Sequence, residues 1–176
     1  MIKLFTEKLI IRDLVFEDLE NHHKLCSNDN VMRYTLKMKP NNIEEANSIN
    51  RQIYSLMIED RATHEFIGEI GYRVTQNTPY GKLVIMGFFI MEKHWNKGYV
   101  TEALKHLLNY MFEKNNVYRI SVGCIKENIG AIKVLEKCRF QKEGEYGEYC
   151  FHENLLKDWV EYGLLKRDGK ICPHFV

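Results

Sequence analysis

A polar turn around Gly98 is the part of this sequence whose residues and spacing best suit the binding of a reactive group. It lies between an apolar run over residues 83–91 and a segment over residues 100–112 in which apolar residues recur three and four positions apart. The run predicts a strand buried on both faces, and the segment predicts an amphipathic helix. Where a glycine-containing turn leads from a strand into a helix, backbone N–H groups can converge on phosphate oxygens. The turn therefore predicts a ligand that carries phosphate.

Two widespread phosphate-binding motifs are absent. Neither the P-loop string Gly-x-x-x-x-Gly-Lys-Ser/Thr nor the dinucleotide string Gly-x-Gly-x-x-Gly occurs in the chain. Residues 95–103 instead read Trp-Asn-Lys-Gly-Tyr-Val-Thr-Glu-Ala. This segment resembles the acetyl-CoA pyrophosphate loop of the GNAT N-acetyltransferase superfamily, Gln/Arg-x-x-Gly-x-Gly/Ala. The resemblance is closest to the ribosomal-protein alanine N-acetyltransferase branch, whose loop usually reads Trp-Gly-Lys-Gly-Tyr-Ala-Thr-Glu-Ala, so that Asn96 and Val100 replace a Gly and an Ala.

A second segment, residues 128–140, resembles the Asn-x-x-Ala/Ser-x-x-x-Leu-Glu-Lys-x-Gly-Phe motif of the same family. In the family the Asn side chain meets the pantetheine arm, although Asn128 could also be a plain helix N-cap. Arg139 replaces the usual Gly, and would be strained by about 1 kcal/mol if its φ is positive. The resemblance implies acetyl-CoA as co-substrate and the following binding residues: Phe89, Ile90, Met91, Trp95, Asn96, Lys97, Gly98, Tyr99, Val100, Thr101, Asn128 and Lys133.

The reaction that the resemblance implies is direct transfer of an acetyl group from a thioester to a primary amine. Such a transfer needs proximity, an oxyanion donor and a route for a proton. Backbone N–H groups of residues 89–91 are the expected oxyanion donors, since the family places a splayed strand there.

The proton-handling residues of the family are missing. Ile85, Ala131 and Leu135 stand where other members carry Glu, Ser and Tyr, respectively. The remaining candidates for a catalytic carboxylate are Glu69, on a strand that enters the cleft, and Glu148, which roughly matches a Glu near the C-terminal hairpin of this branch. Either could equally be a solvated strand residue.

The acceptor is open at this point. An α-amine ionises near ~7.7–8 and a lysine near ~10.4, so at neutral pH about a tenth of an α-amine is already neutral. A site with a weak base therefore suits a protein N-terminal α-amine. A small amine, such as a polyamine, an amino acid or an antibiotic, is the alternative, and an acyl-CoA-binding module without turnover is a third. An acidic cleft would favour a polycationic small acceptor, and an open groove a protein N-terminus.

Composition narrows the remaining classes. The 176 residues suit one core, and a net charge of +1 without a basic stripe argues against nucleic acid. The five cysteines are isolated, which favours a reducing compartment. His22, His23 and Cys26 lie within about one helical turn, but a metal needs further ligands, so we expect a solvated helix edge and no metal. The sequence has no signal-peptide pattern and no run of transmembrane length, so we expect a cytoplasmic protein, a monomer or homodimer, without a membrane partner.

The expected fold is α+β: a single GNAT-like domain over residues 1–176, with a mixed, mostly antiparallel sheet, a splayed central parallel pair and flanking helices. The expected order is β-α-α-β-β-β-α-β-α-β-β. The strands are expected over 6–14, 56–59, 65–74, 83–91, 118–125, 140–149 and 155–165, with a turn-rich connection over 75–81. The helices are expected over 16–25, 43–56, 100–112 and 128–138, with a loop and helix over 28–39. Glycines 68 and 71 inside a strand indicate a bulge or the close approach of another backbone.

Overall fold

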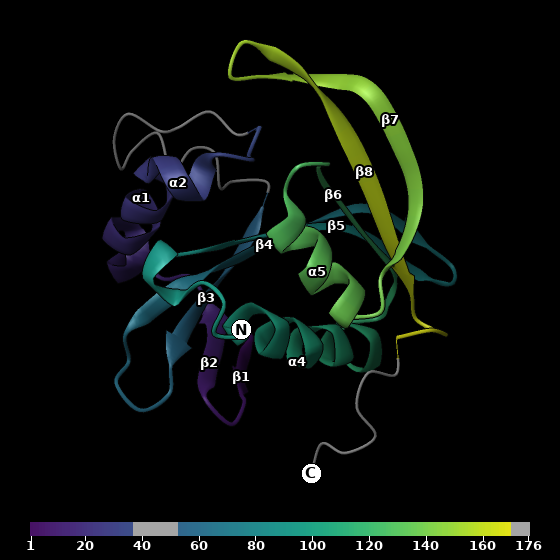
Figure 1. The fold of residues 1–176 in the computed structure, drawn as a ribbon. Helices are drawn as coiled ribbons and strands as arrows, with labels where there is room; N and C mark the ends of the chain where they lie inside the picture. Colours follow the sequence, from purple (N-terminus) through teal and green to yellow (C-terminus); the bar gives the residue numbers. More distant parts are fainter. Residues whose placement is uncertain (37–52, 170–176) are drawn as a thin grey trace. The chain divides into compact units, whose positions relative to one another are not determined.

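The structure, a computed structural model, describes residues 1–36 and 53–169. Its eight strands are hydrogen-bonded in the order β1-β2-β3-β4-β5-β6-β8-β7 (Figure 1). The strands are β1 Lys3–Phe5, β2 Leu9–Asp13, β3 Tyr54–Asp60, β4 Phe66–Thr78, β5 Gly81–Ile90, β6 Val117–Ile125, β7 Gln141–His152 and β8 Leu155–Leu165. The α-helices are α1 Leu19–Ser27, α2 Asp29–Met32, α4 Tyr99–Glu113 and α5 Ile129–Lys137, and short 3-10 turns cover η1 Phe16–Asp18 and η3 Glu92–His94. The α+β class is confirmed.

The chain divides into two compact units. Among the described residues, the first contains 1–33, 53–73 and 86–107, and the second contains 34–36, 74–85 and 108–169. Strands β4 and β5 and helix α4 each continue from one unit into the other. The single domain over 1–176 stays a prediction.

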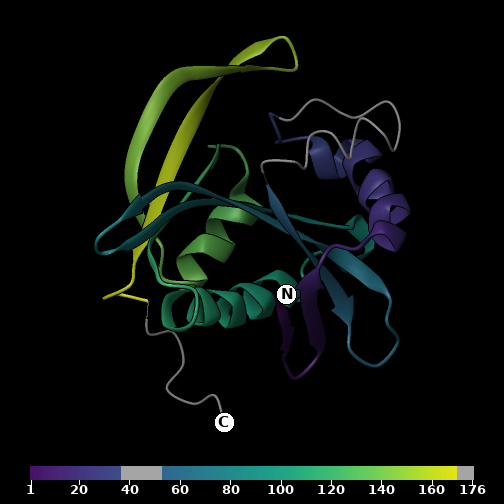
Figure 2. The same cartoon turned by 180° about the vertical axis from the view of Figure 1, so that it is seen from behind.

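In the first unit, β1 to β4 pair antiparallel in chain order. The strand expected over 6–14 is β2, which begins only at Leu9 and forms a hairpin with β1 (Figure 2). Thr6 lies in the turn between the two strands. Its hydroxyl accepts a hydrogen bond from Leu9 N at 2.8 Å, and Thr6 N donates to Leu9 O at 2.9 Å. The helix expected over 43–56 lies mostly outside the described residues, and its last residues begin β3 instead.

In the second unit, β7 and β8 form the predicted antiparallel hairpin, and β8 pairs antiparallel with β6. Figure 1 shows α5 lying in front of β6. The connection expected over 75–81 is mostly strand, because β4 continues to Thr78 and leaves only a tight turn before Gly81. A Cβ at Gly81 would lie 2.7 Å from Asn116 O, which explains the glycine.

The predicted parallel pair is β5 and β6, matched from Lys82 with Val117 to Ile85 with Ser121. Within the described residues their pairing ends there, although β5 runs to Ile90 and β6 to Ile125, as a splayed pair requires. The expected burial of this strand on both faces is wrong. Val84, Met86 and Ile90 are buried, whereas Ile85 is 40% exposed, because side chains alternate between the two faces.

Helix α4 buries the face that its sequence spacing predicts. Ala103, Leu104, Leu107, Leu108 and Met111 are all at most 1% exposed. This burial fixes the rotation of the helix and hence the direction of the turn that precedes it. No helix in residues 1–36 and 53–169 combines the length and the hydropathy that a bilayer crossing requires.

Candidate active site

Two residues of the turn between β5 and α4 have left-handed backbone conformations. Asn96 has a φ of 60° and Gly98 a φ of 79°. Glycine adopts such conformations freely and asparagine does so at low cost, so Asn96 can stand where a glycine is usual. A Cβ on Gly98 would meet no described atom within 4 Å. The glycine is therefore needed for its backbone conformation, and the space beside it is open to a ligand.

The turn leads directly into the N-terminus of α4, which begins at Tyr99. The first N–H groups of a helix have no intrahelical partner, and the helix dipole places positive charge there. Lys97, in the turn itself, is exposed. A left-handed turn, unpaired N–H groups and a lysine fit the pyrophosphate of a nucleotide cofactor.

Trp95 holds this turn to the end of β5. Its indole N–H donates to Ile90 O at 2.8 Å, and its backbone N–H donates to Glu92 O at 3.1 Å. One of the expected oxyanion donors is already engaged, since Met91 N donates to Ile67 O at 2.9 Å. The oxyanion role of Phe89, Ile90 and Met91 stays a prediction, and the hydrogen bond of Met91 fixes the end of the strand.

Gly68 lies against that strand end. A Cβ built on it would be 2.3 Å from Phe89 O and 2.9 Å from Ile90 Cα. The sequence predicted a bulge or a close approach here, and both are present, since the β3–β4 register shifts between Ile58 and Glu59. Any side chain at this position would push the expected oxyanion donors out of place.

Glu102, in the first turn of α4, joins the helix start to the β1–β2 turn. Its Oε1 accepts from Thr6 Oγ1 at 2.5 Å and from Lys8 N at 3.0 Å. These two hydrogen bonds hold one oxygen of the Glu102 carboxylate at the β1–β2 turn. They reduce the repulsion that the carboxylate would exert on an anion at the start of α4. This contact could not be predicted from local sequence patterns, because Thr6 precedes Glu102 by 96 positions.

His94 precedes the turn and is 6% exposed. Burial lowers its pKa; Glu65 acts in the opposite direction, and the positive charges of Lys93 and Lys97 lower it further. His94 is therefore neutral at neutral pH, and its ring lies 5.8 Å from that of Tyr99, centroid to centroid. The neutral ring of His94 therefore packs against Tyr99 at the start of α4 and adds no charge to the turn.

Helix α5 carries the second predicted binding segment, in the second unit. Asn128 Oδ1 accepts from Ala131 N at 3.1 Å, so the residue is an N-cap. Among the residues that the structure describes, nothing bonds its Nδ2 group, which can still donate to a ligand. Lys133 is exposed, and Leu135 is fully buried. The leucine at the position where the resemblance expects Tyr is therefore a core residue.

Arg139 follows the C-cap of α5 and has a φ of 65°, the conformation for which a glycine is usual at this position. Its N–H donates to Glu136 O at 2.9 Å, and Phe140 N–H donates to Leu135 O at 3.0 Å. This pair of bonds is the Schellman motif, which requires a left-handed residue between the helix and the following strand. Arg139 therefore carries backbone strain.

Glu69, the first predicted catalytic carboxylate, is 1% exposed in β4. Its Oε2 lies 2.5 Å from Nδ1 of His22, which is 3% exposed in α1. Burial alone would lower the pKa of His22, but contacts with Cys26 and Glu69 outweigh it and raise that pKa to about 10. His22 was expected on a solvated edge of its helix, and this is wrong. The Glu69 carboxylate is paired with the protonated imidazole of His22.

Glu148, the second predicted carboxylate, lies in a β7 bulge between Tyr146 and Cys150 with a φ of 52°. Its backbone N–H donates to Asp158 Oδ1 at 3.0 Å. The side chain is exposed, and within the described residues its carboxylate has no hydrogen bond or ion pair. A role in proton transfer stays a prediction, but the group is chemically available. No cluster of three or more metal-ligating residues occurs in the described part of the chain.

A family model for the acetyltransferase (GNAT) domain matches residues 8–141. The chain belongs to this family. It is therefore an acetyl-CoA-dependent N-acetyltransferase, and the turn before α4 and the start of α5 are the segments expected to hold the donor.

Individual relatives extend the match over most of the chain. An uncharacterised N-acetyltransferase, p20, of Bacillus licheniformis is 30% identical over 96% of this chain and 98% of its own length. The spermidine N-acetyltransferase of Vibrio cholerae, solved with CoA and spermine, superposes with a TM-score of 0.82 at 22% identity, covering 93% of this chain and 98% of that one. A ribosomal-protein-S5-alanine acetyltransferase of Vibrio fischeri superposes with a TM-score of 0.77 at 18% identity, covering 97% and 100%. These two structures establish the fold and leave the acceptor open.

Proposed function

We propose that this N-acetyltransferase binds the pyrophosphate of acetyl-CoA at residues 95–101 and the pantetheine arm at Asn128, and acetylates a primary amine. The observation that carries the proposal is the left-handed pair Asn96 and Gly98 directly before α4. A left-handed backbone is uncommon for a residue other than glycine, and such positions cluster at ligand-binding sites, as Asn96 does beside Gly98. The N–H groups of the turn and of the helix start bind anions without a metal.

In the proposed reaction the amine nitrogen attacks the thioester carbonyl, the C–S bond breaks and the CoA thiolate leaves. A thiol of this kind ionises near ~8.5, so its departure needs little help from an acid. Backbone N–H groups of Phe89 and Ile90 are the proposed donors to the carbonyl oxygen, and Gly68 keeps that strand end in place. The attacking amine loses a proton, for which Glu148 is the proposed acceptor, directly or through water.

Two acceptor classes fit this chemistry. A protein N-terminal α-amine is already partly neutral at pH 7 and makes small demands on the base. A polyamine is the second class, and the similarity to a spermidine acetyltransferase supports it. The buried His22–Glu69 pair does not discriminate between them, because it leaves Glu69 without a free charge to offer a cation.

The test is thiol release by the purified protein with acetyl-CoA and a panel of peptides and small amines. Turnover on at least one amine supports the proposal, with Gly98→Pro abolishing donor binding because proline cannot adopt a φ of 79°. Tight binding of acetyl-CoA without turnover on any amine would favour a binding module instead.

A further inference from the structure

The face of β6, β8 and β7 opposite α5 has an unusual row of residues across its three strands. Gly123 of β6 and Gly144 of β7 both pair with Glu161 of β8. In the next row Tyr146 pairs with Trp159. Tyr162, the neighbour of Glu161 on the other face, is buried, which sets the two faces apart. Glu161 is thus a carboxylate flanked on both sides by residues without side chains.

Aromatic rings fill the space that the glycines leave. A Cβ on Gly123 would lie 2.4 Å from Trp159 Nε1, and one on Gly144 would lie 3.0 Å from the hydroxyl of Tyr146. Trp159 therefore lies over the backbone of Gly123, together with Glu161 Oε2, and Tyr146 lies over that of Gly144. Tyr149 continues the surface, with its ring centroid 5.2 Å from that of Tyr146 and 6.2 Å from that of Trp159. Tyr146 is 47% exposed and Tyr149 62%.

The charge of this aromatic surface is negative. Glu161 Oε2 accepts from Trp159 Nε1 at 3.0 Å, which turns the carboxylate toward the rings without neutralising it. Two cationic side chains on the same face form ion pairs with other carboxylates. Arg119 makes a bidentate ion pair with Glu143, and Lys157 Nζ lies 3.1 Å from Glu127 Oε1. Arg119 also interacts electrostatically with Glu161: the pKa of Arg119 is raised chiefly by its hydrogen bonds to Glu143, and the charge of Glu161 adds to this effect. Its guanidinium nevertheless bonds to Glu143.

We propose that Trp159, Tyr146, Tyr149 and Glu161 form a binding surface for an aliphatic di- or polyamine. An ammonium group would sit over the ring faces beside Glu161, and the methylene chain would lie on the apolar rings. Rings attract cations through their faces, and Glu161 supplies the opposite charge. The inference rests on the proposed function, because an amine held here is the acceptor of the acetyl group.

Other occupants fit these features less well. A second copy of the chain would be expected to bind an apolar patch, and Phe151, Leu155 and Leu156 are exposed toward the tip of the β7–β8 hairpin. The surface around Glu161 is different, because it has a carboxylate at its centre. A peptide N-terminus has one ammonium and a bulky polar backbone, whereas a thin methylene chain can lie on the exposed rings of Tyr146 and Tyr149. Among the described residues no ion pair of Glu161 is formed, so its charge favours a cation over a neutral ligand of the same shape.

The test is calorimetric binding of spermidine and 1,4-diaminobutane to the full chain, without acetyl-CoA. Glu161→Gln keeps an oxygen for Trp159 Nε1 but removes the charge, and should weaken binding about tenfold. Tyr149→Leu should weaken it about two- to fivefold, whereas Tyr149→Phe keeps the ring face and should bind like the parent. Higher salt should weaken binding to the parent and leave Glu161→Gln less affected.

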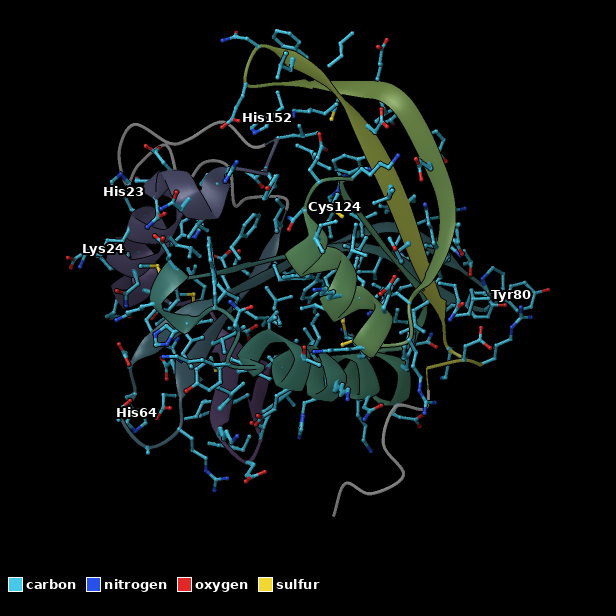
Figure 3. The ribbon with its side chains drawn as sticks, in the orientation of Figure 1. His23, Lys24, His64, Tyr80, Cys124 and His152 are labelled. Atoms are coloured by element: carbon cyan, nitrogen blue, oxygen red, sulfur yellow. The ribbon has the colours of Figure 1, made fainter. Side chains whose placement is uncertain are left out.

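Matched controls exist in the same unit. Tyr80, at the β4–β5 turn and labelled in Figure 3, packs at a tilt of 43° against Tyr118 with ring centroids 6.1 Å apart. Tyr80→Leu should bind polyamine like the parent. Glu153→Gln, at the β7–β8 turn, should also leave binding unchanged. Equal polyamine affinity for the parent, Glu161→Gln and Tyr149→Leu overturns the inference. So does turnover on peptide N-termini with no polyamine binding, which would leave the proposed function standing. Glu161-dependent polyamine binding without thiol release from any amine would support the site and refute the proposed function.

Discussion

Glu69 Oε2 and His22 Nδ1 are 2.5 Å apart, and both side chains are almost completely buried. His22 Nε2 lies 3.7 Å from Cys26 Sγ on the next turn of α1, so the imidazole joins a strand carboxylate to a helix thiol. A buried charge is tolerated only with its partner, because desolvation of an unpaired ion is expensive. The pair therefore fixes α1 on β4, and Glu69 has a structural task whether or not it also handles protons.

Removal of either partner should destabilise the fold strongly. His22→Leu leaves Glu69 buried without a cation, and should lower the free energy of unfolding by about 3–5 kcal/mol. The double variant with Glu69→Leu should be less destabilised than the sum of the two single variants, because no lone charge remains. Urea denaturation of the four proteins measures the coupling, and strict additivity would show that the two side chains do not interact.

The same pair should make stability depend on pH. The pKa of His22 is raised from 6.5 to about 10, so the folded state holds its proton more tightly than the unfolded chain. The stabilisation is therefore complete below pH 6.5 and declines as the pH rises toward 10. The urea midpoint of the parent should fall between pH 7 and pH 9.5 by more than that of Glu69→Gln, in which the partner charge is gone. Parallel declines in both proteins would contradict this assignment.

The His22–Glu69 pair also illustrates what sequence can predict. Helix α4 and the turn at Asn96 and Gly98 were predictable because their signals are local: apolar spacing, a glycine and a known loop pattern. The environment of Glu69 was not, since its partner lies 47 residues earlier and a histidine in loose helical spacing gives no sign of burial. The alternation of buried and exposed side chains along β5 could not be predicted either. A continuous apolar run is compatible with a strand that is covered on one face or on both.

The turn before α4 gives a test of donor binding. Asn96→Gly should leave acetyl-CoA affinity within about threefold, because asparagine already tolerates a φ of 60°. Asn96→Val should weaken binding severely, since a β-branched residue is strongly disfavoured in that conformation. Calorimetry with acetyl-CoA measures both. Equal affinity for all three proteins would show that the left-handed turn does not serve the donor.

Arg139→Gly should make the protein more stable. Arg139 holds a φ of 65° in the Schellman motif after α5, and glycine removes the strain of a side chain there. The expected gain is about 1 kcal/mol, seen as a higher urea midpoint with an unchanged slope. Arg139→Ala is the control, because it removes the same side chain beyond Cβ but keeps the strain. A gain of the same size in the alanine variant would assign the effect to the guanidinium rather than to the backbone.

Leu108, on the inner face of α4, is fully buried. Leu108→Ala should cost about 2–5 kcal/mol of unfolding free energy, because it removes buried methyl groups and leaves a cavity. Glu113→Ala, at the exposed end of the same helix, should leave the midpoint nearly unchanged. A parent-like midpoint for Leu108→Ala would contradict the observed core.

Glu148 offers the sharpest test of the proton route. Its carboxylate is exposed at a bulge, and Asp158 holds its backbone N–H at 3.0 Å, so the position of the main chain does not depend on the side-chain charge. Glu148→Gln should lower kcat/KM by roughly 10²–10⁴-fold on a confirmed amine if this group accepts the proton. Acetyl-CoA affinity should remain at the parent value, because the proposed donor contacts lie elsewhere.

Glu145→Gln is the matched control for Glu148→Gln. Glu145 lies on the same strand, but Lys126 and Lys142 already neutralise its carboxylate, and the lysine contacts lower its pKa to about 2. It cannot accept a proton at neutral pH, so its loss should leave kcat/KM unchanged. If Glu148→Gln also keeps full turnover, no side-chain base is needed there. Catalysis would then rest on holding an amine whose small neutral fraction reacts as it forms, and turnover should rise with pH in step with that fraction.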